Sequence, residues 1–390
     1  MPSITEYDPF APEVKANPYP HYAWLRREAP VYHNPRLGIW ALSRYRDVDA
    51  ALRNTEVFSS AKGIGPERIN LPMMITRDPP EHRRLRSLVN KAFTPRMVAR
   101  MEGRIREILN HLLDAAVDRG SFDLVRDVAE PLPVIVIAEM LGVDPQQRAA
   151  FKRWSDDTIG ALGGSPDFDF QRYLQTWQEF KAYFTELIER RRREPREDLV
   201  SALVATKDGQ DALTPGEILN FNLLLLVAGN ETTTNLISNG ALALLDHRDE
   251  ATRLREHPDL IASAVEECLR YDSPIQATFR TTTREFGIDG VTIPADSKVM
   301  MLYAAANRDA EKFADPDSFK IDREPNDHIA FAIGIHFCLG APLARLEGKI
   351  ALEEVLKRMK NIRFDESAPR VRVDNPLFRG FKQFPLLFER

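Results

Sequence analysis

The sequence contains very little cysteine: among its 390 residues, only Cys268 and Cys338 are cysteines. Two cysteines cannot build a disulfide framework or a multi-cysteine zinc or iron–sulfur site, so both classes are excluded. A basic excess is also missing, because 53 Lys and Arg residues stand against 58 Asp and Glu, a formal net charge of −5. We therefore expect no nucleic-acid partner, since neutralising phosphates normally requires a basic surface.

Long apolar runs are absent as well. The longest aliphatic block, from Leu223 to Ala228, is far shorter than the roughly 20 apolar residues that a membrane-spanning helix needs. The N-terminal segment MPSITEYDPFAPEVKANPYPHYAW lacks the basic start and apolar core of a signal peptide. A cytoplasmic protein without a membrane anchor is expected, and attachment of a loop to a membrane surface stays open.

No repeat, low-complexity tract or Pro/Gly/Ser-rich linker divides the chain. With 43% hydrophobic residues, a chain of this length can bury a large core. No GxGxxG motif follows a strand and precedes a helix, so nothing in the chain is predicted to bind a flavin or nicotinamide. These features predict one domain over residues 1–390, with no fused reductase.

Helix signals dominate the middle of the sequence. A capping residue followed by proline occurs at Asp78, Thr94, Asp144 and Thr214, and Gly120 is expected to end the second of these helices. The helix that begins near Thr214 is predicted to run to about His247, a length of roughly 50 Å, with a buried, apolar middle.

Short strand signals cluster towards the two ends of the chain. Asp289-Gly290 is a two-residue hairpin signal between two of them. The predicted strands are Val31–His33, Ile39–Ser43, Phe286–Ile288, Val291–Ile293, Lys298–Leu302, Ile362–Phe364 and Pro385–Phe388. The fold class is therefore mainly α, with small antiparallel sheets at the margin.

Cys338 stands between Gly334 and Gly340, directly before a helix that opens at Ala341-Pro342. The positive end of a helix dipole lowers the pKa of a thiol, and glycines let a flat group approach the backbone. A lone thiolate in a loop bracketed by glycines has the form of an axial haem ligand. The alternatives are a small buried hydrophobic residue and a cysteine-protease nucleophile, for which the sequence locates no partner.

A second motif, Ala228-Gly229-Asn230-Glu231-Thr232, interrupts the apolar centre of the long helix. Gly and Thr are poor helix formers, and a threonine hydroxyl can bond back to the i−4 carbonyl. The motif indicates a local groove beside a pocket, where Glu231 and Thr232 can relay protons. The alternative is an internally satisfied kink with Glu231 paired to an arginine.

The pattern FxxGxxxCxG from Phe331 to Gly340, followed by a helix, resembles the haem-binding signature of the cytochrome P450 family. The other motifs follow in the order of the family over essentially the whole chain. The resemblance implies a triangular, helix-rich fold and haem b (iron protoporphyrin IX) with Cys338 as its proximal iron ligand. Ala332, where many members carry glycine, departs from the pattern and puts the packing of this loop in question.

The resemblance also implies roles for individual residues. Thr232 would hydrogen-bond to bound oxygen and Glu231 would link it to solvent, and these two are the predicted catalytic residues. The predicted cofactor-binding residues are Cys338, the propionate contacts His82, Arg86, Arg280 and His336, and the haem neighbours Phe331, Gly340 and Ala228. The predicted substrate pocket contains Leu224, Val227, Gln276, Thr278 and Leu377. For each propionate contact the alternative is a solvated surface charge.

Glu267, Arg270 and Arg323 match the family's structural triad, with Cys268 as an inert core residue. The spacing alone is weak evidence, because Glu81/Arg84, Glu189/Arg192 and Glu250/Arg253 share it, and a surface ion pair contributes only tenths of a kcal/mol. A possible basic patch for an electron donor comprises Arg83, Arg84, Lys91, Arg345 and Lys349, with an ordinary solvated helix face as the alternative.

The expected function is a haem-thiolate monooxygenase that inserts one oxygen atom from O2 into a mid-sized, mostly apolar small molecule, by hydroxylation or epoxidation. Electrons are expected from a ferredoxin or flavodoxin with its reductase, and a monomer is expected. A peroxygenase or oxidative coupling enzyme of the same fold is one alternative, and a non-catalytic haem sensor is another.

Overall fold

The computed structural model describes residues 5–68, 72–119, 121–162 and 169–389. Fifteen α-helices are present in these ranges: α1 (Pro12–Ala16), α2 (Tyr19–Glu28), α3 (Tyr45–Arg53), α4 (Glu81–Ala92), α5 (Pro95–Arg100), α6 (Glu102–Arg119), α7 (Pro131–Leu141), α8 (Arg148–Leu162), α9 (Phe170–Arg193), α10 (Leu199–Ala205), α11 (Pro215–Asp246), α12 (Arg248–Glu256), α13 (Ile261–Tyr271), α14 (Tyr303–Ala306) and α15 (Ala341–Arg358). Shorter helical turns include η1 (Met74–Thr76), the π-helical η2 (Leu124–Ala129), η3 (Pro145–Gln147), η4 (Pro258–Leu260) and η5 (Gly334–His336).

The strands form small sheets beside this helical mass. The largest has the order β1 (Val31–Asn34), β2 (Ile39–Leu42), β10 (Lys298–Met301), β7 (Thr278–Thr282) and β3 (Phe58–Ser59). The others are β11 (Lys360–Phe364) with β14 (Pro385–Glu389) and β4 (Ser121–Asp123), β12 (Val371–Arg372) with β13 (Phe381–Gln383), β5 (Lys207–Asp208) with β6 (Asp211–Ala212), and β8 (Phe286–Ile288) with β9 (Val291–Ile293). The pairing is antiparallel except that β10 runs parallel to β2. The prediction of a mainly α fold with small antiparallel sheets is confirmed.

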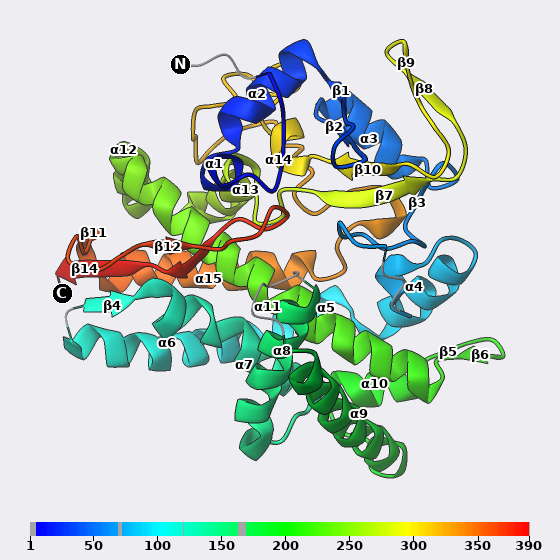
Figure 1. The fold of residues 1–390 in the computed structure, drawn as a ribbon. Helices are drawn as coiled ribbons and strands as arrows, with labels where there is room; N and C mark the ends of the chain where they lie inside the picture. Colours follow the sequence, from blue (N-terminus) through cyan, green and yellow to red (C-terminus); the bar gives the residue numbers. More distant parts are fainter. Residues whose placement is uncertain (1–4, 69–71, 120, 163–168, 390) are drawn as a thin grey trace.

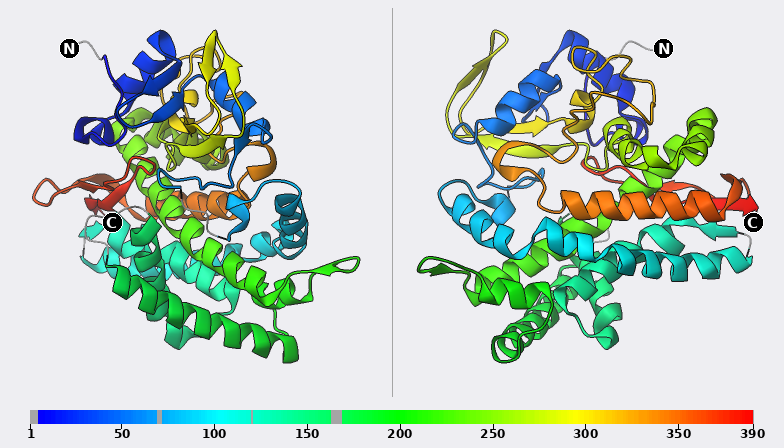
Figure 2. Two further views of the ribbon diagram at one scale, coloured as in Figure 1. Left: turned by 45° about the vertical axis from the view of Figure 1, so that its right-hand side comes forward. Right: turned by 180° about the vertical axis from the view of Figure 1, so that it is seen from behind.

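Figure 1 shows the largest sheet and α1–α3 on one side of the molecule, and α6–α10 on the other. Helices α11 and α15 run between these two parts, as all three views show (Figures 1 and 2). Helix α11 packs against α7, α13 and α15. The centre of the molecule is therefore built around two long helices.

Helix α11 begins and ends where the sequence predicts. The Thr214 hydroxyl accepts from the N–H of Glu217, whose carboxylate accepts from the N–H of Thr214, so a complete capping box fixes the start. Two close approaches fix the packing: a Cβ on Gly229 would lie 2.2 Å from Ile137 Cδ1, and one on Gly240 would lie 3.2 Å from Cys268 Sγ. Cys268 is buried in the core, where burial raises the pKa of its thiol.

Other predicted helix starts need correction. The Asp78 carboxylate accepts from Ser59 Oγ and from the N–H of Ser60, so it does not cap α4, which begins at Glu81. Thr94 does cap a helix, but that helix ends at Arg100 and α6 follows as a separate helix. Asp144 precedes the short turn η3 before α8. Gly120 lies outside the described residues.

None of the helices in the described ranges is both long enough and apolar enough to cross a bilayer.

Candidate active site

Cys338 lies in a tight loop between η5 and the first turn of α15. Its backbone N–H donates to the carbonyl of Phe331 over 2.9 Å, which closes the loop on itself. Gly334 has a φ of +70°, in the left-handed region that favours glycine, and a Cβ there would lie 3.3 Å from the Leu52 carbonyl oxygen. These constraints hold the cysteine at the N-terminus of α15.

Ala332, the departure from the family pattern, also has a left-handed backbone, with a φ of +54°. Its N–H donates to the Ile329 carbonyl over 2.9 Å. For an L-residue with a Cβ this conformation costs roughly 1–2 kcal/mol. The alanine therefore introduces backbone strain into the cysteine loop.

Burial raises the pKa of the Cys338 thiol. The backbone N–H groups of Gly340 and Ala341 and the cations Arg86 and Arg345 act in the opposite direction, but burial outweighs them. The sequence-based expectation of a lowered thiol pKa is therefore wrong for the protein alone. A bound metal ion would deprotonate this thiol on coordination.

A group of basic and imidazole side chains from three elements gathers near Cys338. His82 and Arg86 lie on α4, Arg280 lies on β7 and His336 lies in η5. The His82 and His336 rings have centroids 4.3 Å apart, and His336 Nε2 lies 3.2 Å from Ser60 Oγ. Arg280 Nη1 donates to its neighbouring Phe279 carbonyl over 2.8 Å. We call these four residues the cation cluster.

The cation cluster has an excess of positive charge. Burial lowers the pKa of His336 to about 2, helped by Arg280, His82 and Arg86. Burial and then Arg86 lower the pKa of His82 to about 4, and the buried Nδ1 of His82 has no hydrogen-bond partner among the described residues. No ion pair joins Arg86 or Arg280 to a carboxylate within the described ranges. Asp78 acts on His82 in the direction of a higher pKa, but the two arginines have no carboxylate partner among the described residues.

One face of α11 is left uncovered by protein although the helix crosses the centre of the molecule. Its positions Leu224, Val227, Ala228, Glu231 and Thr232 are half-buried or exposed, while Leu225, Leu226, Asn230 and Thr233 are buried. The uncovered positions follow the i, i+3, i+4, i+7 spacing of a single helix face. An apolar stripe of this kind, in the middle of a core helix, is typical of a ligand-binding surface.

Helix α11 is continuous through this face, as the predicted helix from Thr214 to about His247 requires. The Thr232 hydroxyl donates to the Ala228 carbonyl over 2.8 Å, the i−4 bond that such residues form within helices. Burial raises the pKa of Glu231 to about 7, with Lys382 acting in the opposite direction. Among the described residues Glu231 has no arginine partner, so the alternative of a Glu–Arg ion pair is not supported.

Comparison with known proteins decides the family. The family model described as Cytochrome P450 matches residues 39–378. The chain belongs to the cytochrome P450 family. Cytochrome P450 109 of Bacillus spizizenii is 40% identical over 376 residues, which cover 95% of this chain and 91% of the relative. Steroid C26-monooxygenase of Mycolicibacterium smegmatis is 39% identical, and the match covers 94% of this chain and 92% of the relative. Vitamin D(3) 25-hydroxylase of Pseudonocardia autotrophica is 41% identical, and the match covers 98% of this chain and 96% of the relative.

Solved structures agree with this assignment. The P450 CYP109Q5 from Chondromyces apiculatus superposes with a TM-score of 0.90 at 43% identity, covering 98% of each chain. CYP109E1 from Bacillus megaterium, solved with testosterone, superposes with a TM-score of 0.89 at 38% identity, covering 96% of this P450 and all of the other chain. The protein is thus a haem-thiolate monooxygenase with the P450 fold, as the motifs predicted.

The residues present in this P450 fit a haem. The two propionate carboxylates of a haem would give Arg86 and Arg280 the anionic partners that they lack, and a buried arginine without an anion is otherwise unfavourable. A propionate oxygen would also give His82 Nδ1 the partner that it lacks. A Cβ at Gly340 would lie 3.9 Å from Cys338 Sγ, an ordinary contact distance.

The predicted substrate pocket is only partly assembled by the fold of this P450. Leu224 and Val227 lie on the open face of α11. Thr278 is half-buried and shares a 2.6 Å hydrogen bond with the Tyr303 hydroxyl. Gln276 lies elsewhere: it is buried, its amide oxygen accepts from the Tyr22 hydroxyl and its amide nitrogen donates to the Ser273 carbonyl.

Leu377 contacts Gln276 directly. It packs in the core cluster around Tyr7, Tyr22 and Phe279, and its carbonyl accepts from the N–H of Gln276 over 2.7 Å. Since both polar ends of the Gln276 amide already have protein partners, we withdraw Gln276 as a polar anchor for substrate. Leu377 has only a slight exposure and contributes packing instead.

Glu267, Arg270 and Arg323 meet in one buried cluster. Arg270 donates two hydrogen bonds to the Glu267 carboxylate over 2.7 and 2.8 Å, and Arg323 Nε lies 3.0 and 3.1 Å from the two oxygens of that carboxylate. Arg270 also donates to the carbonyls of Asn307, Pro316 and Ser318. Helix α13 is thereby tied to the irregular segment that precedes the cysteine loop.

The other copies of the Glu-x-x-Arg spacing differ from this cluster. Arg84 turns away from Glu81 and pairs with Asp211 and Glu217. Glu189 pairs with Arg192, but both side chains are exposed. Burial and the convergence of two arginines on one carboxylate distinguish the copy at Glu267.

A second ion cluster beside the cysteine loop was missed by the sequence reasoning. Arg345 donates two hydrogen bonds of 2.7 Å to Glu266, His328 Nε2 lies 3.1 Å from the same carboxylate, and the Arg345 guanidinium stacks 4.7 Å from the centroid of Phe331. These bonds lower the pKa of Glu266 to about 2, although burial alone would raise it. The consecutive acids Glu266 and Glu267 were the available signal: Glu267 is buried, Glu266 is half-buried, and each carboxylate has its own cations.

The predicted basic patch is largely neutralised. Arg345 pairs with Glu266, Arg84 pairs with Asp211 and Glu217, and Lys91 pairs with Asp208 at 3.0 Å. Three of its five cations therefore have acidic partners on the protein itself. Among the described residues, Arg83 and Lys349 have no such ion pair.

Proposed function

We propose that Cys338 is the thiolate ligand of the haem iron and that the cation cluster binds the haem propionates. The observation that carries this proposal is the cluster itself: His82, Arg86, Arg280 and His336 converge near Cys338, and among the described residues neither arginine forms an ion pair with a carboxylate. Their distribution over α4, β7 and η5 means that a bound haem would join elements that are far apart in the sequence.

When bound, the haem supplies the binding and reductive activation of O2. The protein's own residues position it and handle protons. Glu231, with a pKa raised to about 7 by burial, exists in both protonation states near neutral pH and can pass a proton on. The Thr232 hydroxyl now donates to Ala228, and rotation about its side chain would free that hydrogen for an acceptor on the open face of α11. We infer that these two residues deliver protons.

The substrate that we propose is a mid-sized, mainly apolar molecule of about steroid size. Leu224, Val227 and Ala228 give the open face of α11 an apolar surface. Relatives at 39% and 41% identity are named for steroid C26-monooxygenase and vitamin D(3) 25-hydroxylase activity, and a similar structure holds testosterone. Hydroxylation of an unactivated C–H bond is the expected reaction, and an induced shift in the haem spectrum would report binding.

We further propose a ferredoxin or flavodoxin, with its reductase, as the electron donor. Arg83 and Lys349 are the members of the predicted patch left for such a partner, because the other three have acidic partners. Electrostatic steering should therefore be weak. Reduction rates that change less than about threefold between low and physiological ionic strength would support this, and a steep fall would contradict it.

The test of the haem ligand is a carbon monoxide spectrum of the ferrous protein. The wild type should give the absorption band of thiolate-ligated haem. Cys338→Ser should lose this band, and Cys268→Ser is the matched control that should retain it. An unchanged spectrum for Cys338→Ser would refute the assignment.

Proton delivery is tested separately with Thr232→Ala. Haem content should remain normal while a larger share of the reducing equivalents leaves as hydrogen peroxide, and Thr233→Ala, on the buried side of the same turn, is the comparison. Equal coupling in Thr232→Ala and wild type would remove Thr232 from the mechanism. Efficient turnover with hydrogen peroxide and no reductant would favour the peroxygenase alternative.

A further inference from the structure

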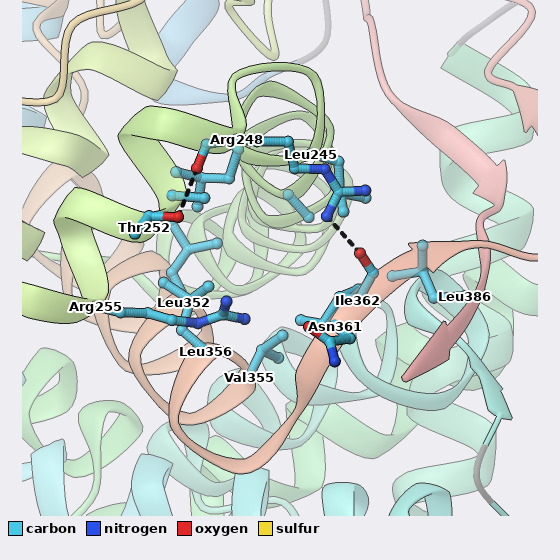
Figure 3. A pocket seen from close by; sticks show the side chains of 13 residues that line it. Leu245, Arg248, Thr252, Arg255, Leu352, Val355, Leu356, Asn361, Ile362 and Leu386 are labelled. Carbon is cyan, nitrogen blue, oxygen red and sulfur yellow. Dashed lines mark hydrogen bonds between the residues drawn. The ribbon is translucent and has the colours of Figure 1, made fainter. Parts of the chain in front are cut away.

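A cavity lies between the second half of α11, α12, the second half of α15 and the strands β11 and β14 (Figure 3). Its volume is about 190 Å³. An apolar cavity of about 150 Å³ admits benzene, so this one can hold a single aromatic ring or a short alkyl chain. Ala241, a residue of this cavity, lies roughly 14 Å along α11 from Thr232. The cavity is thus separate from the proposed haem site.

The cavity has an apolar interior and a polar rim. The apolar residues are mostly buried and come from five elements: Leu244, Leu245, Ala251, Leu352, Val355, Leu356, Ile362 and Leu386. The rim consists of the exposed residues Arg248, Thr252, Arg255 and Asn361. An apolar pocket with a few convergent polar groups is the usual form of a small-molecule site.

The two arginines of the rim extend from α12 towards β11, as Figure 3 shows. Arg248 Nη1 donates to the Ile362 carbonyl over 2.6 Å, and Arg255 Nη2 donates to the Met359 carbonyl over 3.1 Å. These bonds hold both side chains at the rim. Because a guanidinium has five N–H donors, each arginine retains further donors for a ligand.

The rim also lacks a balancing negative charge. In the ranges that the structure describes, neither Arg248 nor Arg255 forms an ion pair with a carboxylate, and burial together with Arg248 lowers the pKa of Arg255. Glu389 accepts a hydrogen bond from the Asn361 amide but does not line the cavity. Two neighbouring cations at the mouth of an apolar cavity favour a ligand with an anionic head.

We propose that this cavity binds a small amphiphilic carboxylate, whose ring or alkyl chain fills the apolar interior and whose carboxylate pairs with Arg248 and Arg255. Planar guanidinium groups recognise carboxylates through paired N–H···O bonds, which gives both affinity and orientation. The ligand would contact the ends of α11 and α15, the two helices whose other parts carry the proposed proton-delivery residues and the cysteine loop. The site itself does not depend on which residue holds the haem.

The test uses the haem-loaded protein with 4-phenylimidazole saturating the haem pocket, so that the probe cannot bind there. The probe is 4-fluorophenylacetate, followed by broadening and shift of its ¹⁹F resonance, and its neutral control is the corresponding amide. We expect saturable binding of the acid and at least tenfold weaker binding of the amide. Absence of saturable binding, equal binding of acid and amide, or binding that disappears when 4-phenylimidazole is added would overturn the proposal.

Variants locate the probe. Arg248→Gln/Arg255→Gln should weaken binding of the acid at least tenfold, and Ala241→Leu, which fills part of the cavity, should weaken acid and amide alike. Arg253→Gln is the matched control on α12, because Arg253 pairs with Asp322 and Glu250 and does not line the cavity. Unchanged affinity in the double variant, with each protein showing the wild-type haem spectrum, would place the probe elsewhere and refute the site.

Discussion

The imidazole rings of His82 and His336 pack against each other with centroids 4.3 Å apart and an interplanar angle of 53°. One ring comes from α4 and the other from the loop that carries Cys338, so their contact joins two elements that are far apart in the sequence. Burial lowers the pKa of both histidines, which are therefore neutral at physiological pH in the protein alone. The permanent positive charge of the cation cluster comes from Arg86 and Arg280.

Replacing Arg280 by glutamine should therefore weaken haem retention by about ten- to a hundredfold, since hydrogen bonds to charged groups contribute roughly 1.5–3 kcal/mol. The rate of haem transfer to excess apomyoglobin measures this. Arg284→Gln, an exposed arginine just beyond β7, is the control and should transfer haem at the wild-type rate. If both variants lose haem equally, Arg280 does not bind a propionate.

Glu231→Gln should remove a pH dependence from catalysis. Burial raises the pKa of Glu231 to about 7, so its protonated form is present below that pH and is lost above it. Product formed per electron pair in the wild type should fall as pH rises from 6 to 8.5. In Glu231→Gln it should be at least tenfold lower at pH 6 and flat with pH. Lys382→Met removes a cation that lowers this pKa, so the midpoint of its pH profile should lie above that of the wild type. If Glu231→Gln keeps the wild-type pH profile, Glu231 does not deliver protons.

Ala332→Gly should stabilise the protein slightly. The left-handed backbone of Ala332 costs roughly 1–2 kcal/mol, which glycine would relieve. Glycine also raises the entropy of the unfolded chain, which offsets about 0.4–1 kcal/mol of this gain. We expect a net gain of about 0.5–1 kcal/mol in the free energy of unfolding. Ala344→Gly, within α15, is the opposite control and should lose about 1 kcal/mol. Denaturant titration distinguishes the two, and a loss in both variants would show that Ala332 is not strained.

Glu267→Gln should destabilise the fold by about 3–5 kcal/mol, because it leaves Arg270 and Arg323 buried without their common carboxylate. Glu189→Gln breaks an exposed pair with the same i,i+3 spacing and should cost less than about 0.5 kcal/mol. Chemical unfolding and the yield of haem-loaded protein measure both. Similar losses for the two variants would mean that the buried triad contributes no more than a surface ion pair.

Glu347→Gln should stabilise the protein in a pH-dependent manner. Glu347 is buried in α15, its Oε2 has no hydrogen-bond partner among the described residues, and burial raises its pKa to about 8. As pH rises from about 4.5 to 8, the unfolded chain ionises this group and the folded protein does not, which favours unfolding. The variant should match the wild type near pH 4.5 and exceed it by about 1–3 kcal/mol at pH 8.5. A difference that is constant with pH would contradict this.

The local signals in the sequence were sufficient for several elements. The capping box at Thr214 and Glu217 and the long apolar stretch after it place α11 correctly, because capping and helix periodicity depend on neighbouring residues only. The hairpin at Asp289-Gly290 follows from the same kind of local rule. The family assignment likewise depends on short motifs that can be read directly, and the comparisons confirm it.

Side-chain partners could not be predicted in this way. Whether Asp78 caps a helix or binds Ser59 and Ser60, and whether Arg345 serves a docking surface or Glu266, is decided by residues distant in the sequence. The family resemblance placed Gln276 in the substrate pocket, but its amide oxygen accepts from the hydroxyl of Tyr22, which α2 brings there.

The sequence by itself determined the family, the cysteine loop before α15 and the course of the long helix, since each is written in adjacent residues. Only the tertiary structure decided that the thiol pKa is raised, that one face of α11 is open, that Glu231 has no arginine partner, and that two arginines meet at the mouth of a separate cavity. Burial and electrostatic interactions depend on which distant groups surround an atom, and that is fixed only when the chain is packed.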